Sequence, residues 1–263
     1  MTNTPHVDPW IGAKAALFVV SHSGGKDSQA MLIRVLEAVP ASQVLVVHAT
    51  LGDLEWPGAL ELAQKQAQDA GCAFLVAKAY FKDGRAKSLL DKVEHQITLN
   101  GAGTPPWPSP NNRWCTGELK TQPIEREVRR YASQHGYTTV VSCVGLRAQE
   151  SDDRKAKAVW EHKPKKSCAH RSWFEWLPIH ELSTSEVFAT IADAGQEPHP
   201  AYANGNERLS CLFCIYASKR DLRNASIAHP EVYARYLELE ERTGYPMHLD
   251  RKPLAELVAQ AAL

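Results

Sequence analysis

A strand, a pair of glycines and a helix follow one another without a break near the start of the chain. The segment Phe18–Leu36 reads FVVSHSGGKDSQAMLIRVL, an apolar run that ends at Gly24 and Gly25 and takes on a helical pattern from Asp27. The glycines permit backbone angles and a close approach that a side chain would block. Such a turn aims several backbone N–H groups and the positive end of the helix at one point, which predicts an anion-binding site.

The residues that follow the glycines suit a phosphate. Lys26 adds a positive charge, and the Ser28 hydroxyl is able to cap the helix or to hydrogen-bond a phosphate oxygen. We expect Asp27 to orient Mg²⁺, which favours carboxylate and phosphate oxygens; the alternative is an acid that offsets the helix dipole. A plain strand-to-helix turn would also contain such glycines. The P-loop pattern and the pattern GxGxxG are both absent.

The order of apolar runs indicates the fold class. The strand-like runs AALFVVS, QVLVVHA, AFLVAKA and TTVVSCVGL alternate with helical patterns, which predicts an α/β fold with a parallel twisted sheet and flanking helices. Glycine and proline clusters between Phe81 and Asn112 predict a long surface loop. We expect a nucleotide-binding domain over residues 1–150 and a smaller, basic, cysteine-bearing C-terminal region over residues 151–263 that completes the active site.

Composition indicates which partners and which cellular compartment to expect. Thirty basic and thirty acidic side chains leave no net charge, so the overall field does not steer the chain to nucleic acid or to a membrane. The first ten residues, MTNTPHVDPW, lack the pattern of an export signal, and no apolar run reaches the roughly 18 residues of a membrane span. We therefore expect a cytoplasmic protein with no membrane partner. Its six cysteines then favour metal or thiol chemistry over disulfides.

Five motifs together resemble a known family. SGGKDS (Ser23–Ser28) resembles the PP-loop of the ATP pyrophosphatase superfamily, whose members cleave ATP to AMP and pyrophosphate. Four further stretches, in this order, resemble the phosphoadenosine phosphosulfate reductase family, which includes the ATP-using sulfurtransferases of DNA phosphorothioation: RWCTGELKTQPI (113–124), GLRAQESDDR (145–154), WLPIHELSTSEVFATI (176–191) and PAYANGNERLSCLFC (200–214).

The resemblance implies an activity and its partners. It implies an adenine nucleotide alpha hydrolase-like fold that uses ATP and Mg²⁺ to adenylate an acceptor oxygen, which sulfur then replaces. The implied acceptor is a DNA backbone phosphate, or alternatively a tRNA base. A cysteine desulfurase would donate the sulfur, and the other subunits of a modification system linked to phage defence would be partners.

The resemblance also implies roles for individual residues. The nucleotide would be bound by Ser23, Gly24, Gly25, Lys26, Asp27, Ser28 and Gly145, and the catalytic residues would be Lys26, Asp27 and Arg147. Gly145 and Arg147 follow a strand directly, where ligands bind in open α/β sheets. Arginine suits a phosphate because its planar fork matches two oxygens; the alternative is a surface arginine paired with Glu150 or Asp152. Thr50 stands where the family often has an acid, and Asp53 or Glu55 is a possible substitute.

The cysteines indicate a metal centre. Cys211 and Cys214, in CLFC, are spaced to hold one centre, and Cys115 lies at the family's cluster position. Three thiolates on an iron–sulfur cluster, of the 4Fe–4S type, would leave one iron open to carry sulfide; Cys168 or His170 is the alternative fourth ligand. The four cysteines Cys115, Cys168, Cys211 and Cys214 could instead form a closed zinc site, or there is no metal. Cys72 and Cys143 lie in or beside apolar runs and read as small buried hydrophobes.

A basic segment follows the sheet motifs. Between Arg154 and Arg171 lie five lysines, with Trp160 inside the segment and Trp173 just beyond it: Lys155, Lys157, Lys163, Lys165 and Lys166. Positive charge beside aromatic rings suits contact with a nucleic-acid strand. A solvated loop with ordinary lysines is the alternative.

Two other functions remain open. A sulfonucleotide reductase would need a catalytic thiol, and the tail beyond Cys214 contains no cysteine, which disfavours that reading. A nucleotide-sensing subunit without turnover is the second alternative, and the intact Lys26, Asp27 and Arg147 disfavour it.

Overall fold

The computed structural model describes residues 16–101 and 104–261. Two compact units arise from interleaved segments of the chain. The sheet unit comprises Met1–Ala49, Gly58–Ala77 and Ile124–His199, and the helical unit comprises Thr50–Pro57, Lys78–Pro123 and Pro200–Leu263. These units differ from the two consecutive segments, 1–150 and 151–263, that the sequence suggested. Each unit consists of three segments that are separate in the sequence but contact one another in the fold. A division into two consecutive segments cannot describe a chain that leaves a unit and later returns to it.

The sheet unit contains a six-stranded sheet in the order β3-β2-β1-β4-β6-β5. Its strands are β1 (Ala16–Ser21), β2 (Val44–Ala49), β3 (Ala73–Ala77), β4 (Thr139–Cys143), β5 (Trp160–His162) and β6 (Ser172–Trp176). All neighbouring strands are parallel except β5, which pairs antiparallel with β6 at one edge. The predicted α/β class with a largely parallel sheet is confirmed.

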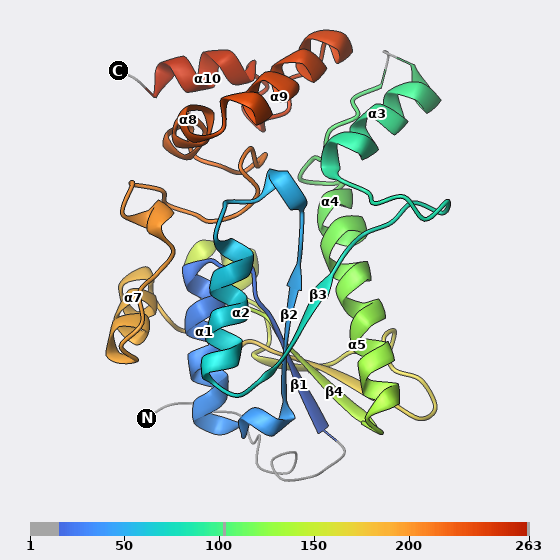
Figure 1. Cartoon of the computed structure of the whole chain (residues 1–263), viewed down its shortest axis with the longest axis vertical. Coiled ribbons are helices and arrows are strands. Elements are labelled where there is room, and N and C mark those ends of the chain that lie inside the picture. Colours follow the sequence, from blue (N-terminus) through green and yellow to red (C-terminus); the bar gives the residue numbers. More distant parts are fainter. Residues whose placement is uncertain (1–15, 102–103, 262–263) are drawn as a thin grey trace. The chain divides into compact units, whose positions relative to one another are not determined.

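Alternating side chains of the central strands enter two separate cores, as the period of two along a strand requires. Phe18 and Val20 of β1 pack with the helices α1 (Lys26–Ala38), α2 (Ala59–Asp69) and α7 (Thr184–Asp193). Leu17 and Val19 pack on the other face with α5 (Gln122–Gln134). Figure 1 shows α1, α2 and α7 on one side of the strands and α5 on the other.

The strand order positions a ligand site. The chain moves from β1 outward to β2 and β3, then returns so that β4 pairs with the opposite side of β1. The loops that leave the carboxyl ends of β1 and β4 therefore diverge, and ligands of open α/β sheets bind at such a switch point. These are the loops that carry Gly24 and Arg147.

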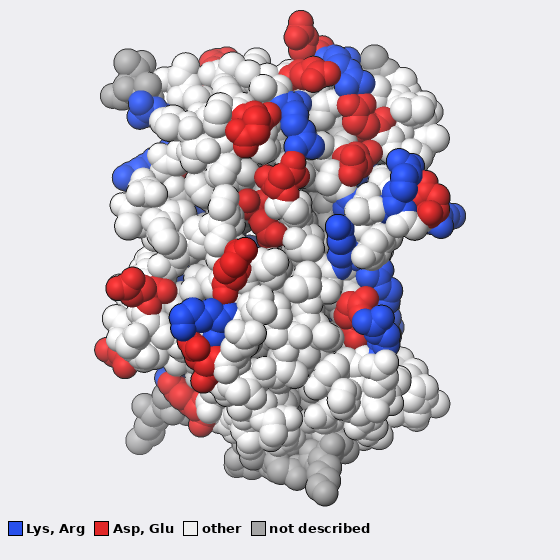
Figure 2. Space-filling model, viewed as in Figure 1, with Lys and Arg blue, Asp and Glu red and all other residues white. Residues whose placement is uncertain are grey.

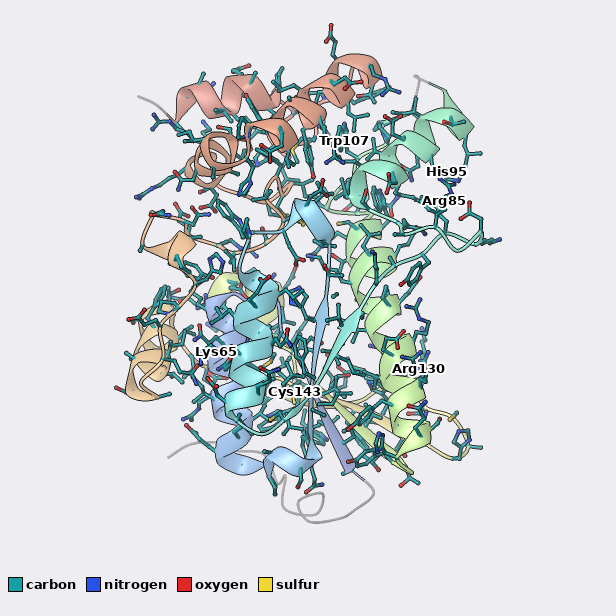
Figure 3. The ribbon with its side chains drawn as sticks, in the orientation of Figure 1. Lys65, Arg85, His95, Trp107, Arg130 and Cys143 are labelled. Carbon is teal, nitrogen blue, oxygen red and sulfur yellow. The ribbon has the colours of Figure 1, made fainter. Side chains whose placement is uncertain are left out.

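The helical unit is built around aromatic side chains. It contains α3 (Leu89–Asn100), α4 (Trp114–Thr116), α8 (Lys219–Ala228), α9 (Pro230–Thr243) and α10 (Leu254–Gln260). Its core includes Trp107, Phe213 and Tyr236, each at most 6% exposed. Figure 3 labels Trp107 beside α9, on which Tyr236 lies.

The loop predicted over Phe81–Asn112 is partly wrong. Helix α3 occupies its middle and begins with a capping box, in which Ser88 and Asp91 satisfy each other's backbone N–H groups. Ser-x-x-Asp before an apolar run is a helix-start signal that the surrounding glycines and prolines obscured. Trp107 is also buried, so this part of the segment is not a surface loop.

The charged surface and the lengths of the apolar helices agree with what the sequence predicts. On the face shown in Figure 2 acidic and basic side chains are interspersed. Within residues 16–101 and 104–261, none of the helices is long and apolar enough to cross a membrane. The expectation about the first ten residues lies outside the described part of the chain.

Candidate functional site

The turn after β1 is shaped by a glycine that no other residue could replace without movement. Gly24 has φ +76°, and a Cβ built on it would lie 2.5 Å from the carbonyl oxygen of Ala59 and 2.6 Å from its Cα. Ala59 is the first residue of α2, whose N-cap Gly58 is also left-handed at φ +89°. Gly24 is therefore required twice, for its backbone angle and for the close approach of α2.

Helix α1 begins at Lys26, directly after the second glycine of the pair. Gly25 is its N-cap in an extended conformation and supplies no side-chain cap. The Ser28 hydroxyl donates to the Gly25 carbonyl at 2.8 Å and accepts the Ser23 N–H at 3.2 Å, so it closes the turn. The first-turn amides of an α-helix have no intrahelical acceptor and carry the positive end of the dipole. The turn therefore presents donors of the kind that an anion needs, and anion binding stays a prediction.

A buried polar network beneath the turn was not predicted from the sequence. His22 Nδ1 accepts the Gly24 N–H at 3.0 Å, and its Nε2 lies 2.6 Å from Oε1 of Gln66 on α2. Nδ1 as acceptor fixes Nε2 as the protonated nitrogen. Gln66 in turn donates to Gln196 at 2.8 Å. Burial is the main cause that lowers the pKa of His22 to about 4, so the ring is neutral near pH 7.

The signal for this network is weak in the sequence. Isolated glutamines on α2 and beyond α7 look like ordinary surface residues until the fold brings them together. Only the polar His22 at the end of an apolar strand could have suggested a buried hydrogen-bonding role.

The three predicted catalytic residues meet at the start of α1. Lys26 Nζ lies 3.2 Å from Oδ2 of Asp27, and Nε of Arg147 lies 2.7 Å from Oδ1 of the same carboxylate. The side chains of Lys26 and Arg147 are 5% and 6% exposed, whereas that of Asp27 is 30% exposed. The carboxylate is thus held between two buried cations with one side open.

Arg147 is anchored by more than its ion pair. Its NH1 group donates to Gln149 at 3.0 Å and to the Thr184 hydroxyl at 3.2 Å. The predicted alternative, a surface arginine paired with Glu150 or Asp152, does not match these contacts: the carboxylate of Glu150 accepts the Arg147 backbone N–H, at 3.1 Å, rather than the guanidinium. Direct contact with a phosphate stays a prediction, because the guanidinium already orients Asp27.

Gly145 lies against the same helix turn. A Cβ at this position would meet the carbonyl oxygen of Asp27 at 3.5 Å, which is an ordinary van der Waals contact. Gly145 therefore adjoins the start of α1, as its predicted role requires. Contact with the nucleotide stays a prediction.

The residues at this turn fit a magnesium ion held in part by a substrate. Mg²⁺ in nucleotide sites is bound by one or two carboxylates together with phosphate oxygens and waters. A carboxylate has about four lone-pair positions, so Asp27 retains capacity beyond its two cationic partners. It is the acid that would hold the ion.

Three of the predicted metal ligands share one cavity of the helical unit. Cys115, Cys211 and Cys214 line it together with Lys120, and its volume is about 50 Å³. A single water needs roughly 10–15 Å³, so several water-sized atoms fit. Much of the remaining wall is aromatic or aliphatic, and includes Trp107, Phe213, Ile215, Tyr216 and Met247.

Local structure brings these side chains together. The segment around Cys211 is fixed by an isolated bridge to Glu55 and by the Leu212 N–H, which donates to Leu54 at 2.9 Å. Lys120 lies on the π-helical turn Gly117–Thr121, a widened turn of a kind common at functional sites. Its Nζ lies 3.9 Å from Sγ of Cys211. The lysine was not predicted as a site residue.

The thiols of the pair differ in their acidity. The pKa of Cys214 is lowered to about 5, first by a hydrogen bond from Cys211 and then by the Tyr216 N–H, Lys120 and Ser210. The same thiol–thiol bond, together with burial, raises the pKa of Cys211 well above its usual range. The charge of the cysteines, that of Cys211 foremost, raises the pKa of Lys120, which stays protonated.

These residues carry the donors of a thiolate-ligated centre. Within the described residues, no group of three His, Cys, Asp or Glu side chains converges as one metal ion requires. Thiolate is the natural ligand of an iron–sulfur cluster and also of zinc. The half-buried Lys120 ammonium beside the thiols offsets the negative charge that thiolate ligation brings. Cys115, Cys211 and Cys214 are the residues that would hold the cluster.

The other cysteines have separate surroundings. Cys168 belongs to the sheet unit, where its Sγ lies 3.6 Å from Nε2 of His170. Its role as a fourth ligand stays a prediction, as does that of His170. Cys143 is fully buried and Cys72 is 9% exposed, and burial raises the pKa of both thiols. Their interpretation as small buried hydrophobes matches this placement.

The basic segment is less available than the sequence suggested. Trp173 is 1% exposed and its indole N–H donates to Ser142 at 2.9 Å, so it belongs to the core and cannot stack on a base. Lys163 pairs with Glu161 and Glu175, and Lys166 pairs with Glu125. Among the described residues, no salt bridge engages the remaining three: Lys155, Lys157 and Lys165.

The acids after β2 are engaged within the helical unit. Asp53 pairs with Arg235 of α9, and Glu55 accepts a hydrogen bond of 2.7 Å from the Thr50 hydroxyl. A role for either acid in nucleotide binding stays a prediction.

Comparison with known proteins finds a matching family and one related protein. The profile of the phosphoadenosine phosphosulfate reductase domain matches residues 17–217. A protein of Escherichia phage 186, described as an uncharacterized 37.8 kDa protein in the gpa 5′ region, is 26% identical over 264 residues, covering 89% of this chain and 77% of that protein.

Two solved structures illustrate the range of similar folds. The phosphoadenylyl-sulfate reductase of Candida auris, in a phosphate complex, has a TM-score of 0.47 and 16% identity, over 78% of this chain and 86% of that one. The U34-tRNA thiolase of Methanococcus maripaludis, solved with its 4Fe–4S cluster, has a TM-score of 0.44 and 15% identity, over 91% of this chain and 76% of that one.

Proposed function

The chain belongs to the phosphoadenosine phosphosulfate reductase domain family, and from that premise we propose that it is an ATP pyrophosphatase that replaces an acceptor oxygen with sulfur. The proposed acceptor is a non-bridging oxygen of a DNA backbone phosphate. The observation that carries the proposal is the cavity of three thiols around Lys120, in a chain that also has an anion-binding turn. Nucleotide cleavage alone would need only the turn, whereas sulfur delivery needs the thiols as well.

The first step would activate the acceptor. The acceptor oxygen attacks the α-phosphorus of ATP, the bond from that phosphorus to the bridging oxygen breaks, and pyrophosphate leaves with the electron pair. The first-turn amides of α1 and the Lys26 ammonium would stabilise the charge that develops on the leaving group. Mg²⁺, when bound, neutralises the same phosphates. Arg147 would keep Asp27 oriented for that ion.

The second step would install the sulfur. Hydrosulfide attacks the adenylated acceptor phosphorus, and AMP leaves with the oxygen that the acceptor contributed. An iron–sulfur cluster, when bound, would supply the sulfide. The chain's own contribution is the thiolate ligands and the Lys120 charge beside them. A cysteine desulfurase is the proposed source of the sulfur. It carries the sulfur as a persulfide, so a thiol reductant must supply the two electrons that convert it to hydrosulfide. Other subunits of a DNA-modification system are proposed partners.

Reduction of a sulfonucleotide is the second candidate, and the family itself favours it. Such an enzyme binds an adenylylated sulfate and releases no pyrophosphate. Lys26 supports the first proposal, because a buried cation at the start of α1 suits a leaving group with several negative charges.

Nucleotide products distinguish the two candidates. Protein purified without oxygen is incubated with ATP and Mg²⁺, with and without DNA, and AMP and pyrophosphate are quantified by chromatography. We expect both products in equal amounts, and their loss in Lys26→Ala. Lys65→Ala is the matched control, because Lys65 lies exposed on α2 and pairs with Asp69 on the same helix (Figure 3). Tight binding of adenylylated sulfate without ATP cleavage would favour the reductase.

Sulfur transfer needs its own measurement. Labelled cysteine, a cysteine desulfurase, ATP, Mg²⁺ and a thiol reductant are combined with the iron-loaded protein and either DNA or tRNA. The nucleic acid is then digested and analysed by mass spectrometry. A dinucleotide heavier by the difference between sulfur and oxygen supports the DNA acceptor. Label that enters only a tRNA base would instead identify a tRNA-thiolating enzyme.

A further inference from the structure

The thiol cavity has a neighbour whose polar group has no partner. Tyr236 of α9 is fully buried, and among the described residues its hydroxyl is one of the few buried side-chain polar atoms without a hydrogen bond. A hydroxyl left unsatisfied in a protein interior destabilises the fold, because it has lost its hydrogen bonds to water and gained none. Native proteins rarely keep such a group unless a water, an ion or a ligand completes it.

The ring of Tyr236 is held by two residues that line the cavity. Its centroid lies 5.7 Å from that of Trp107, with the rings nearly parallel, and 5.0 Å from that of Phe213. The Trp107 indole is fixed in turn, since its N–H donates to the Tyr245 carbonyl at 2.8 Å. The packing of its ring against these two residues therefore fixes where the Tyr236 hydroxyl lies.

Tyr236 shares a core with the thiols. Cys115 and Cys214 pack against the buried hydrophobic core that contains Tyr236, Trp107 and Phe213. Burial raises the pKa of the phenol, so its hydroxyl stays a donor. A protonated hydroxyl without an acceptor is suited to an electron-rich group inside the cavity.

We propose that the Tyr236 hydroxyl donates a hydrogen bond to an anionic sulfur of the iron–sulfur cluster held by Cys115, Cys211 and Cys214, and so acts as a positioning residue. This inference rests on the cluster that the proposed function includes. Hydrogen bonds to cluster sulfurs stabilise the more negative, reduced state, and outer contacts of this kind tune reduction potential and metal affinity.

Tyr236→Phe removes the hydroxyl and leaves the ring. In iron-free protein we expect equal or higher resistance to urea, because an unsatisfied group is lost. In iron-loaded protein we expect a more negative reduction potential and faster loss of iron to a chelator. Tyr233→Phe is the matched control, since Tyr233 lies on the same helix and stacks on Phe213 at 5.7 Å. Tyr233→Phe should change neither the reduction potential nor the rate of iron loss.

The outcomes separate this inference from the proposed function. If wild-type protein takes up iron and Tyr236→Phe alters neither its potential nor its retention, the role of Tyr236 is wrong and the cluster stands. If iron-free Tyr236→Phe is clearly less stable than wild type, the hydroxyl has a partner in the protein or a bound water, which also overturns the inference. Wild-type protein that binds no iron would overturn the cluster and, with it, the role of Tyr236.

Discussion

Oδ1 of Asp27 accepts a hydrogen bond of 2.7 Å from Nε of Arg147 across 120 residues of sequence. The bond ties the first turn of α1 to the loop after β4, the two segments that diverge at the switch point of the sheet. The orientation of the only carboxylate in the SGGKDS turn thus depends on a residue from the other side of the site.

Replacement of Arg147 should slow nucleotide cleavage without preventing nucleotide binding. In Arg147→Ala, Asp27 loses its orienting cation, and we expect kcat for AMP formation to fall by about 100-fold, as loss of positioning often costs. Arg147→Lys should recover part of that loss, because it restores charge without the planar fork. Steady-state kinetics over a range of Mg²⁺ concentrations measures both effects.

The matched control is Arg130→Ala, at an exposed arginine of α5 that pairs with Glu127 on the same helix. It should leave kcat within twofold or so, the scale on which surface changes act. Wild-type kinetics in Arg147→Ala would contradict the role assigned to the ion pair.

Replacement of Gly24 should separate steric contact from backbone strain. A Cβ at Gly24 would collide with Ala59, whereas one at Gly71, which is also left-handed at φ +70°, would meet nothing within 4 Å. Gly71→Ala should cost about 1 kcal/mol of unfolding free energy, and Gly24→Ala about 2–3 kcal/mol, with loss of nucleotide binding. Urea titration and calorimetry with ATP test this. Equal costs at the two glycines would show that the approach of α2 is unimportant.

Removal of the cavity thiols should abolish iron binding. Cys115→Ala, Cys211→Ala and Cys214→Ala should each retain the fold and lose most bound iron, because each removes one thiolate ligand. Cys143→Ala is the control at a buried thiol of β4, which Figure 3 labels. Iron analysis and the visible absorption spectrum measure the result. Full iron content in Cys211→Ala would contradict the cluster, and its loss in Cys168→Ala would identify the fourth ligand.

The sheet and its switch point could be predicted because their signals are local. Apolar runs of four or five residues next to helical patterns are sufficient to indicate parallel strands, and the paired glycines are sufficient to indicate an anion-binding turn. Arg147 was found because it directly follows such a run. The helix α3 was missed for the converse reason, since prolines and glycines on either side masked its capping box.

The buried polar groups could not be predicted, because their function arises from contacts between distant segments. Nothing in the sequence near Gln66 marks it as a neighbour of His22. Lys120 lies in the same motif as Cys115, and that motif is the one signal that could have linked it to the thiols. Trp173 shows the opposite error: an aromatic beside a basic run suggested a stacking platform, yet its place on β6 puts it in the core. The direction of a side chain from a strand is fixed by pairing, which the sequence does not display.

The unpaired lysines should contribute to DNA binding, and the paired ones should not. Changing Lys155, Lys157 and Lys165 together to Gln should weaken binding of duplex DNA. It should also reduce the dependence of log K on log salt by about 0.9 for each DNA phosphate that the variant no longer neutralises. The double variant Lys163→Gln with Lys166→Gln is the control, because glutamates already neutralise these lysines. Fluorescence anisotropy at several salt concentrations provides the comparison, and equal effects of the two variants would argue against a specific patch.

Protonation of His22 should destabilise the fold in mild acid. The pKa of His22 is lowered from an ordinary 6.5 to about 4, mainly by burial. The unfolded chain therefore binds this proton first as pH falls, so its contribution lowers stability progressively between pH 6.5 and about 4 and is absent above that range. The loss amounts to about 3 kcal/mol at 1.36 kcal/mol per unit. His22→Asn removes the titrating group and keeps an acceptor for the Gly24 N–H. Urea unfolding at a series of pH values should give a flatter profile for this variant, and parallel profiles would show that other groups cause the acid sensitivity.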